Sequence, residues 1–408
     1  MTQTSASETS KKSPQQALIE LGEAHFVRNY RQQPVVLERG EGVRVWDKEG
    51  RSYLDLLGGI ATSSMGHCHP EVMAAVQAQV GKLWHTSNIY WNEPSILLAE
   101  KLARASGLDR VFFCNSGAEA NEAMLKLARK VMKDRGQPDR FEIIAFERSF
   151  HGRTLATVAA TGQPKYQQGF EPLLPGFVHV PYGDLEAVKA AMGSQTAAVL
   201  VEVIQGEGGV RPAPEGFLEG LRELCDTNGS LLLIDEVQTG VGRTGKAFAY
   251  QHKNILPDAI STAKSLGGGL PVGAMVCRDA LSESLVPGTH GSTFGGNPVA
   301  CAGANVVMDK VLSPGFLEEI AAKGAHLLEG ARALAKRLPE RIVDVRGMGL
   351  LAGVELNEEA APVVARCREL GLLVNLAGPK TVRFAPAYVV TNSELDEGLA
   401  ILEKALAG

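Results

Sequence analysis

Short apolar runs rich in branched and aromatic side chains recur through the middle of the chain. Between residues 110 and 277 they read RVFFC, EIIAFE, FVHVPY, AAVLVEVI, LLLID, DAIST and GAMVC. Segments with helical spacing of apolar positions, such as residues 118–133 and 214–229, separate several of these runs. Continuous apolar strands that alternate with helices are typical of a mostly parallel sheet buried on both faces. The pattern predicts an α/β fold with a mostly parallel seven-stranded sheet.

The pattern changes toward the C-terminus. Residues 317–338 have the spacing of a long amphipathic helix, residues 342–356 and 372–375 read as strands, and a closing helix is expected from Ser393. Together with the strands expected within residues 43–56, these elements predict a smaller α+β domain. We therefore expect a flexible tail at residues 1–20, small-domain segments at 21–80 and 311–408, and a large domain at 81–310.

Composition narrows the class of partner. The 408 residues are 45% hydrophobic and 21% charged, with a net charge of -5, so no basic field for nucleic acid is present. The six cysteines are far apart and form no C-x-x-C pair, which is typical of reduced thiols. Neither a signal peptide nor a membrane-spanning run is evident. We expect a cytoplasmic protein that binds small molecules or other chains, and neither nucleic acid nor membrane.

Three positions that directly follow predicted strands are candidates for chemistry, because ligands of open α/β sheets bind outside the carboxyl ends of the strands. Ser116 can cap a helix with Glu119, and the small residues Ser116, Gly117 and Ala118 leave amide groups open for a phosphate. Asp235 ends the run LLLID, and Lys264 follows the run DAIST. An ordinary helix cap and a solvated strand-end acid are the alternative interpretations of the first two.

Asp235 and Lys264 are 29 residues apart (264 − 235), about the span of one strand, one crossover and the next strand. Both side chains can therefore reach the same edge of the sheet as the phosphate site. A desolvated lysine is a nucleophile toward carbonyl groups, and an acid can hold a protonated ring nitrogen. The cofactor that needs a lysine, an acid and a phosphate site together is pyridoxal 5′-phosphate.

Residues 240–246 offer a competing interpretation, since their spacing fits the phosphate loop G-x-x-x-x-G-K of nucleotide-binding proteins. The next residue is Ala247, where that loop needs a hydroxyl for magnesium. We interpret this segment instead as a turn that keeps bulk away from the crevice. His67 and His69 in GHCHP lack a third ligand, so no metal is expected there.

Six motifs in order, NSGAEANEA, FHGRT, QGEGG, LLLIDEVQTGVGRTG, STAKSLGGG and GSTFGGNP, give the chain a specific likeness. From about residue 35 to the C-terminus it resembles the class III (ornithine-type) aminotransferases, and within them most closely the acetylornithine branch. The resemblance implies a pyridoxal-phosphate enzyme of fold type I. It also implies a homodimer with each active site at the subunit interface.

The resemblance implies a role for each site residue. Lys264 would be the Schiff-base lysine and Asp235 the partner of the pyridine nitrogen, so these two are the catalytic residues. The expected cofactor contacts are Phe150 and Val237 on the two ring faces, Gln238 on the ring hydroxyl, Ser116, Gly117 and Ala118 on the phosphate, and Thr293 from the neighbouring subunit. The expected substrate contacts are Arg153 on the α-carboxylate, the pair Glu207 and Arg383, and Ser292.

Two of these assignments have structural alternatives. Arg153 could form a structural salt bridge, and Glu207 with Arg383 could form a fixed ion pair. By the resemblance, Glu207 covers Arg383 when an ω-amino donor is bound and moves away to admit the carboxylate of 2-oxoglutarate.

The implied reaction transfers the δ-amino group of N2-acetylornithine to 2-oxoglutarate, giving N-acetylglutamate 5-semialdehyde and glutamate, a step of arginine biosynthesis. Succinyldiaminopimelate, ornithine, 4-aminobutyrate and carrier-bound lysine are alternative donors. The serines of IATSSMG, at residues 60–66, depart from the family's usual apolar residues near the substrate and leave this choice open. A phosphate-loop ATPase and an inactive scaffold are alternatives from other classes.

Overall fold

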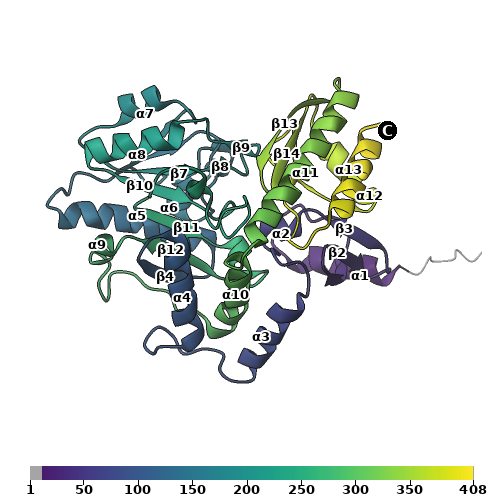
Figure 1. The fold of residues 1–408 in the computed structure, drawn as a ribbon, viewed down its shortest axis with the longest axis horizontal. Helices are drawn as coiled ribbons and strands as arrows, with labels where there is room; N and C mark the ends of the chain where they lie inside the picture. Colours follow the sequence, from purple (N-terminus) through teal and green to yellow (C-terminus); the bar gives the residue numbers. More distant parts are fainter. Residues whose placement is uncertain (1–11, 408) are drawn as a thin grey trace, which may run out of the picture.

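The computed structural model describes residues 12–407. A seven-stranded sheet forms the centre of the large domain (Figure 1). Its strands, in spatial order, are β4 (Arg110–Cys114), β12 (Gly273–Cys277), β11 (Ala259–Thr262), β10 (Leu231–Asp235), β7 (Thr196–Glu202), β5 (Glu142–Phe146) and β6 (Phe177–Val180). Only β12 runs antiparallel to its neighbours β11 and β4. The mostly parallel seven-stranded sheet predicted from the apolar runs is confirmed.

Alternate residues of the buried strands pack into two separate hydrophobic clusters. On β10, Leu231 and Leu233 join the cluster that contains helix α5 (Gly117–Asp134), whereas Leu232 and Ile234 join the cluster that contains helix α8 (Phe217–Asn228). Side chains alternate between the two faces of a strand. Asp235 therefore lies on the face that α5 covers, and this decides which residues can reach its carboxylate.

Further helices surround the sheet and connect its strands. They are α4 (Glu93–Ser106), α6 (Leu155–Ala160), α7 (Leu185–Ala191), α9 (Asp279–Ser282) and α10 (Pro298–Val311), with 3₁₀ turns at Pro164–Tyr166, Ala249–His252 and Lys264–Gly267. The short helix α2 (Gly58–Ala61) and α3 (Pro70–Val80) lead from the N-terminal strands into the large domain. The predicted helices at residues 118–133 and 214–229 correspond to α5 and α8.

Both ends of the chain contribute to the smaller part of the molecule, on the right in Figure 1. One sheet has the order β1 (Leu37–Glu41), β2 (Arg44–Asp47), β3 (Ser52–Asp55) and β15 (Leu372–Leu373), and a second has the order β13 (Ile342–Met348), β14 (Leu351–Leu356), β17 (Thr381–Phe384) and β16 (Asn375–Leu376). Helices α11 (Phe316–Arg337), α12 (Ala361–Glu369) and α13 (Asn392–Ala407) pack with these sheets. The domain boundaries themselves stay a prediction.

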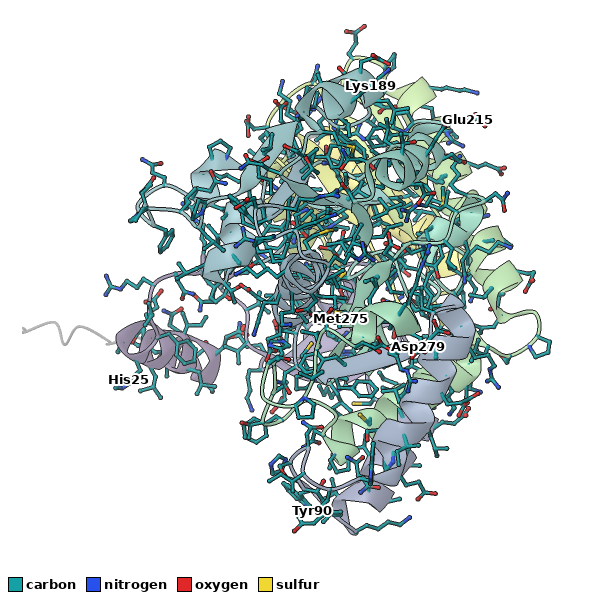
Figure 2. All side chains as sticks on the ribbon, turned by 90° about the vertical axis from the view of Figure 1, so that its left-hand side faces the viewer. His25, Tyr90, Lys189, Glu215, Met275 and Asp279 are labelled. Atoms are coloured by element: carbon teal, nitrogen blue, oxygen red, sulfur yellow. The ribbon has the colours of Figure 1, made fainter. Side chains whose placement is uncertain are left out.

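The start of the described chain differs from the expected flexible tail. Residues 14–20, predicted as tail, form the first part of helix α1 (Pro14–His25). Ser13 caps this helix by accepting a hydrogen bond from the amide of Gln16, and Pro14 occupies the first turn, where no backbone donor is needed. The rest of the predicted tail, residues 1–11, lies outside the described residues. Figure 2 shows His25 at the end of a helix that stands out from the body.

The glycine-rich segment at residues 240–246 forms turns between the two parts of the molecule. A Cβ on Gly245 would lie 2.9 Å from Cβ of Ala321 on α11, so glycine permits this close approach. Arg243 is fully buried and donates hydrogen bonds to the carbonyls of Leu350 and Pro386. The segment is a turn, as predicted, but it packs against the small domain and does not line the crevice.

The phosphate-loop alternative is wrong on structural grounds. Lys246 leads into bends and the single 3₁₀ turn Ala249–His252, whereas a phosphate loop opens directly into a helix.

Within residues 12–407, no helix has the length and apolar character needed to cross a membrane.

Candidate active site

A cavity of about 440 Å³ lies at the carboxyl ends of the central strands. It brings together four segments that directly follow β4, β5, β10 and β11, and a fifth from the turn after β8 (Ile204–Gln205). The predicted site residues that line it are Ser116, Gly117, Ala118, Phe150, Arg153, Glu207, Asp235, Val237, Gln238 and Lys264. Arg383, Ser292 and Thr293 do not line it.

The first turn of α5 forms an anion site at one end of the cavity. The hydroxyl of Ser116 accepts a hydrogen bond from the amide of Glu119 at 3.2 Å, as the predicted cap requires. The Glu119 carboxylate accepts from the amide of Asn115 instead of that of Ser116. Within the described chain, the amides of Ser116, Gly117 and Ala118 meet no acceptor, and they share the positive end of an 18-residue helix.

Asp235 is 5% exposed and is held by four donors. Its Oδ2 accepts from Nδ2 of Asn121 at 2.7 Å and from Nδ1 of His151 at 2.8 Å. Its Oδ1 accepts from the amide of Val237 at 3.0 Å and from the hydroxyl of Ser261 at 3.4 Å. A buried carboxylate is tolerated only when such donors compensate its lost hydration. The alternative of a solvated strand-end acid is therefore excluded.

Lys264 follows β11 with φ of 39°, in the left-handed region that a residue with a Cβ rarely adopts. Burial lowers the pKa of its amine below the usual range; the carboxylates of Glu207 and Asp235 oppose this effect and Arg383 adds to it. No acceptor among the described residues contacts its Nζ. The arrangement favours a neutral amine, which is the form that acts as a nucleophile or base.

Arg383 lies behind Glu207 and Gln238, at 1% exposure. Its Nη1 donates to the Glu207 carboxylate, to the carbonyl of Gly206 at 3.1 Å and to Oε1 of Gln238 at 3.1 Å. Its Nε and Nη2 are buried without a partner in the part of the chain described. Burial raises the pKa of Glu207, but the charges of Arg383 and Lys264 outweigh that effect and lower it. The structure thus brings the predicted pair into contact.

Both ends of the Gln238 amide are engaged within the protein, because its Nε2 also donates to Oε1 of Glu207 at 3.2 Å. Its contact with a ring hydroxyl stays a prediction.

Arg153 faces the cavity with its guanidinium over the ring of Tyr166, 3.9 Å from the centroid, and 5.6 Å from that of Phe150. Phe150 and Tyr166 meet edge to face at 5.6 Å. Within residues 12–407 no carboxylate forms an ion pair with Arg153, so the salt-bridge alternative finds no support. The two aromatic rings hold the guanidinium by cation–π attraction and leave its donors available.

Ser292 and Thr293 belong to a neighbouring loop. The Ser292 hydroxyl accepts from Nδ2 of Asn115 at 3.3 Å and from the amide of Gly295 at 3.0 Å, so it buttresses a cavity residue without lining the cavity. Thr293 is exposed. The substrate contact of Ser292 and the partner-subunit contact of Thr293 stay predictions. Outside the cavity, His67 contacts Asp55 at 2.8 Å.

Four cavity or supporting residues were not predicted from the sequence: Asn121, His151, Tyr166 and Glu202. Asn121 is a polar residue on the buried face of α5, and His151 adjoins Phe150, so both gave a weak signal. Glu202 is paired in register with Asp235 on β7, and burial together with the Asp235 charge raises its pKa well above the usual range. Only the strand order, which the sequence does not give, brings Glu202 next to Asp235.

Comparison with known proteins agrees with this geometry. The family model described as aminotransferase class-III matches residues 26–406. The chain belongs to the class III aminotransferases.

A relative called acetylornithine aminotransferase from Myxococcus xanthus is 64% identical over 93% of this chain and 95% of its own length. One called succinylornithine transaminase/acetylornithine aminotransferase, from Pseudomonas aeruginosa, is 47% identical over 94% and 95%. The crystal structure of an ornithine aminotransferase from Toxoplasma gondii ME49 superposes with a TM-score of 0.93 at 34% identity, covering 97% of this chain and 96% of that one.

Pyridoxal 5′-phosphate is the cofactor of this aminotransferase class, and the cavity fits it. Open amides at the start of α5 suit the phosphate, and the anchored Asp235 carboxylate suits a protonated ring nitrogen. Gly117 lets Val237 approach, because a Cβ there would lie 2.6 Å from Cγ1 of Val237. Lys264 supplies the amine. The individual contacts remain our assignments.

The lowered pKa of Lys264 gives a first testable prediction. In the cofactor-free protein, acetylation of Lys264 by acetic anhydride should have a pH midpoint below that of exposed lysines, because burial favours the neutral amine. Glu207→Gln should lower the midpoint further, since the Glu207 charge stabilises the ammonium. Site-resolved mass spectrometry across pH measures both. The exposed Glu329→Gln serves as the control, and a Lys264 midpoint equal to that of surface lysines would contradict the expectation.

Proposed function

We propose that this aminotransferase moves the δ-amino group of N2-acetylornithine to 2-oxoglutarate, giving N-acetylglutamate 5-semialdehyde and glutamate in arginine biosynthesis. The observation that carries the proposal is Arg383, a buried guanidinium covered by one carboxylate, that of Glu207, and with two nitrogens, Nε and Nη2, that have no partner within residues 12–407. A site that alternates between a donor and an acceptor needs such a removable cover. The 64% identity to the Myxococcus xanthus acetylornithine aminotransferase supports the choice of donor.

The chemistry of the two substrates explains the two arginines. In N2-acetylornithine the reacting δ-carbon bears no carboxylate, so Glu207 remains over Arg383, while Arg153 takes the distant α-carboxylate by a bidentate contact. In 2-oxoglutarate the reacting carbon is bonded directly to a carboxylate, which needs a cation beside Lys264. Glu207 then moves aside, Arg383 binds this carboxylate, and Arg153 takes the other one.

Lys264 and Asp235 carry the proton and charge work. When bound, pyridoxal phosphate supplies an electron-withdrawing ring that makes the adjacent substrate C–H acidic. Burial lowers the pKa of Lys264 and so favours the neutral amine, the form that can remove a proton from the substrate carbon and return it to the cofactor side. Positioned proton transfer of this kind contributes about 10²–10⁴-fold in rate. Asp235, fixed by Asn121 and His151, keeps a negative charge at the far end of the ring.

The direct test is the visible absorbance of the purified holoenzyme before and after N2-acetylornithine is added without an acceptor. We expect the yellow band to be lost with the donor and to return with 2-oxoglutarate. Lys264→Ala serves as the control. In this variant both absorbance changes should be much slower than in the wild type or absent. A yellow protein that responds to ornithine or 4-aminobutyrate but not to acetylornithine would overturn the proposed donor.

A donor panel separates the acyl groups. The Pseudomonas aeruginosa relative carries both succinylornithine and acetylornithine in its name. We propose acetylornithine as the preferred donor, because the relative at 64% identity carries only that donor in its name. The measure is the kcat/KM for acetylornithine divided by that for succinylornithine, succinyldiaminopimelate or a carrier-bound lysine.

Substitution of the two arginines should separate the half-reactions. Arg383→Met removes the cation that would bind the acceptor carboxylate next to the reacting carbon. The binding of 2-oxoglutarate should weaken by about 10- to 100-fold, which corresponds to the loss of a charge-assisted hydrogen bond. The donor half-reaction should fall by a smaller factor, through the higher pKa of Lys264 once the Arg383 charge is gone. Arg153→Met should weaken the binding of both substrates, since each has a carboxylate far from the reacting carbon. Single-turnover absorbance with each substrate measures the two effects. Equal losses for both substrates in Arg383→Met would contradict the proposed alternation.

We further propose that the enzyme is a homodimer. Trp84, Ile89, Tyr90, Trp91 and Phe294 are 65, 83, 72, 90 and 58% exposed, which is unusual for large apolar side chains. The two segments that carry them are joined, because Asn297 donates to the Trp84 carbonyl at 2.8 Å and the rings of His85 and Phe294 lie 5.1 Å apart. Figure 2 shows Tyr90 at the lower edge of the molecule, away from the body.

Thr293 precedes Phe294 in this apolar patch, so pairing of two patches would bring Thr293 close to the partner subunit, as the proposed cofactor contact requires.

Six free cysteines, five of them buried, support a cytoplasmic location.

Placing a charge in the patch should weaken the dimer. Trp91→Asp is expected to shift the sedimentation coefficient from dimer toward monomer at micromolar concentration, because the charge would lose its hydration in the interface. Leu370→Asp, an exposed apolar position on the small domain, is the matched control and should remain dimeric. A wild-type protein that sediments as a monomer would refute the dimer.

A further inference from the structure

The turn that carries Glu207 is pinned at both ends by arginines of one sheet. It connects β8 (Ile204–Gln205) to β9 (Arg211–Pro212). Nη1 of Arg383 donates to the carbonyl of Gly206 at 3.1 Å, and Nε of Arg346 donates to the carbonyl of Gly209 at 2.8 Å. The two carbonyls bracket Glu207 and Gly208. The turn therefore has one tether inside the site and one outside it.

The two arginines belong to a single row of the sheet. On β13 and β14 Arg346 is opposite Gly353, and on β14 and β17 Gly353 is opposite Arg383. Directly opposite residues project from the same face, so both guanidiniums reach the turn from the same side. Between them Gly353 leaves a gap that Val210 fills, since a Cβ on Gly353 would lie 2.9 Å from Cβ of Val210.

The turn is strained and close-fitting at the positions that these contacts hold. Val210 has φ of 50°, which a β-branched residue avoids unless its surroundings impose it. At Gly209, φ is 110°, and a Cβ would lie 3.0 Å from Nη2 of Arg346. Strain of this kind persists only where packing and hydrogen bonds over-determine it. The hydrogen bond from Arg346 to Gly209 is one of these restraints, and the packing of Val210 against Gly353 is another.

Arg346 is held independently of the cavity. Its Nη1 donates to Asp344 at 2.6 Å and to Glu355, and its side chain is 11% exposed. Neither acid lines the cavity. Arg383, in contrast, shares its Nη1 among the Gly206 carbonyl, Gln238 and the Glu207 carboxylate. Release of Glu207 disturbs the inner tether and leaves the outer one intact.

We propose that Arg346 is a positioning residue for acceptor specificity: it fixes the Glu207 turn so that Glu207 leaves Arg383 by side-chain rotation alone. This inference rests on the proposed alternation of Glu207 and Arg383. Without the hydrogen bond from Arg346, only Arg383 holds the turn. The Glu207 carboxylate then stays near the Arg383 guanidinium and competes with the carboxylate of 2-oxoglutarate. With the donor, Glu207 covers Arg383 in either case, so the donor half-reaction does not depend on Arg346.

The test is Arg346→Met, which keeps a long side chain and removes the donors. We expect the apparent Kd of 2-oxoglutarate to rise about tenfold in single turnover, because the Glu207 carboxylate then occupies Arg383 in most molecules and competes with the acceptor. The donor half-reaction should stay within about twofold. Hydrogen–deuterium exchange of the peptide spanning residues 204–212 should accelerate in the cofactor-free and the loaded protein. Arg337→Met, which removes a surface ion pair with Glu403, is the matched control and should change none of these.

A double-mutant cycle decides whether Arg346 acts through Glu207. In a Glu207→Ala background, Arg346→Met should no longer affect the acceptor, because no carboxylate remains to compete. Equal losses in both half-reactions, or an unchanged acceptor effect in that background, would overturn the positioning role. The wild-type protein tested in parallel separates this failure from that of the proposed function, which would show as no reaction of the wild type with 2-oxoglutarate.

Discussion

The buried carboxylate of Asp235 is the constraint on which the rest of the site depends. An unpaired charge at this strand end would be strongly destabilising, so donors must converge on it. The donors come from four elements. Asn121 lies on α5, His151 follows β5, Val237 follows β10, and Ser261 lies on β11. Each donor is part of an element that also carries another site group. Satisfying one carboxylate therefore fixes the relative positions of the anion site, the aromatic wall and the lysine.

The sequence carried much of this arrangement because its strongest signals are local. Seven apolar runs marked the seven strands, and strand ends marked Asp235 and Lys264. Asn121, His151 and Glu202 were missed because their roles depend on which helix covers which face and which strands are neighbours. Those facts follow from contacts between residues that are far apart in sequence, and a single sequence does not specify them.

Two segments differ from what their local sequence pattern led us to expect. Residues 14–20 fall within the tail expected from the polar first sixteen residues, yet a local cap at Ser13 and a proline in the first turn start α1 there. At residues 240–246 the local glycine pattern suggested a turn beside the crevice. The glycines instead allow contact with α11, and Arg243 joins the turn to carbonyls of the small domain. Glycine spacing shows where the backbone needs freedom and does not show what approaches it.

The balance of charge around Lys264 explains why a movable carboxylate suits this cavity. Burial lowers the pKa of the amine, Glu207 raises it, and Arg383 lowers it further. If Glu207 moved away and nothing replaced it, Lys264 would meet an uncompensated guanidinium in a buried setting, where charges interact strongly. In the proposed reaction, the acceptor's carboxylate takes the place of the departing one on Arg383. The charge near Lys264 is then similar in both halves of the cycle, so the same neutral amine can move the proton in each.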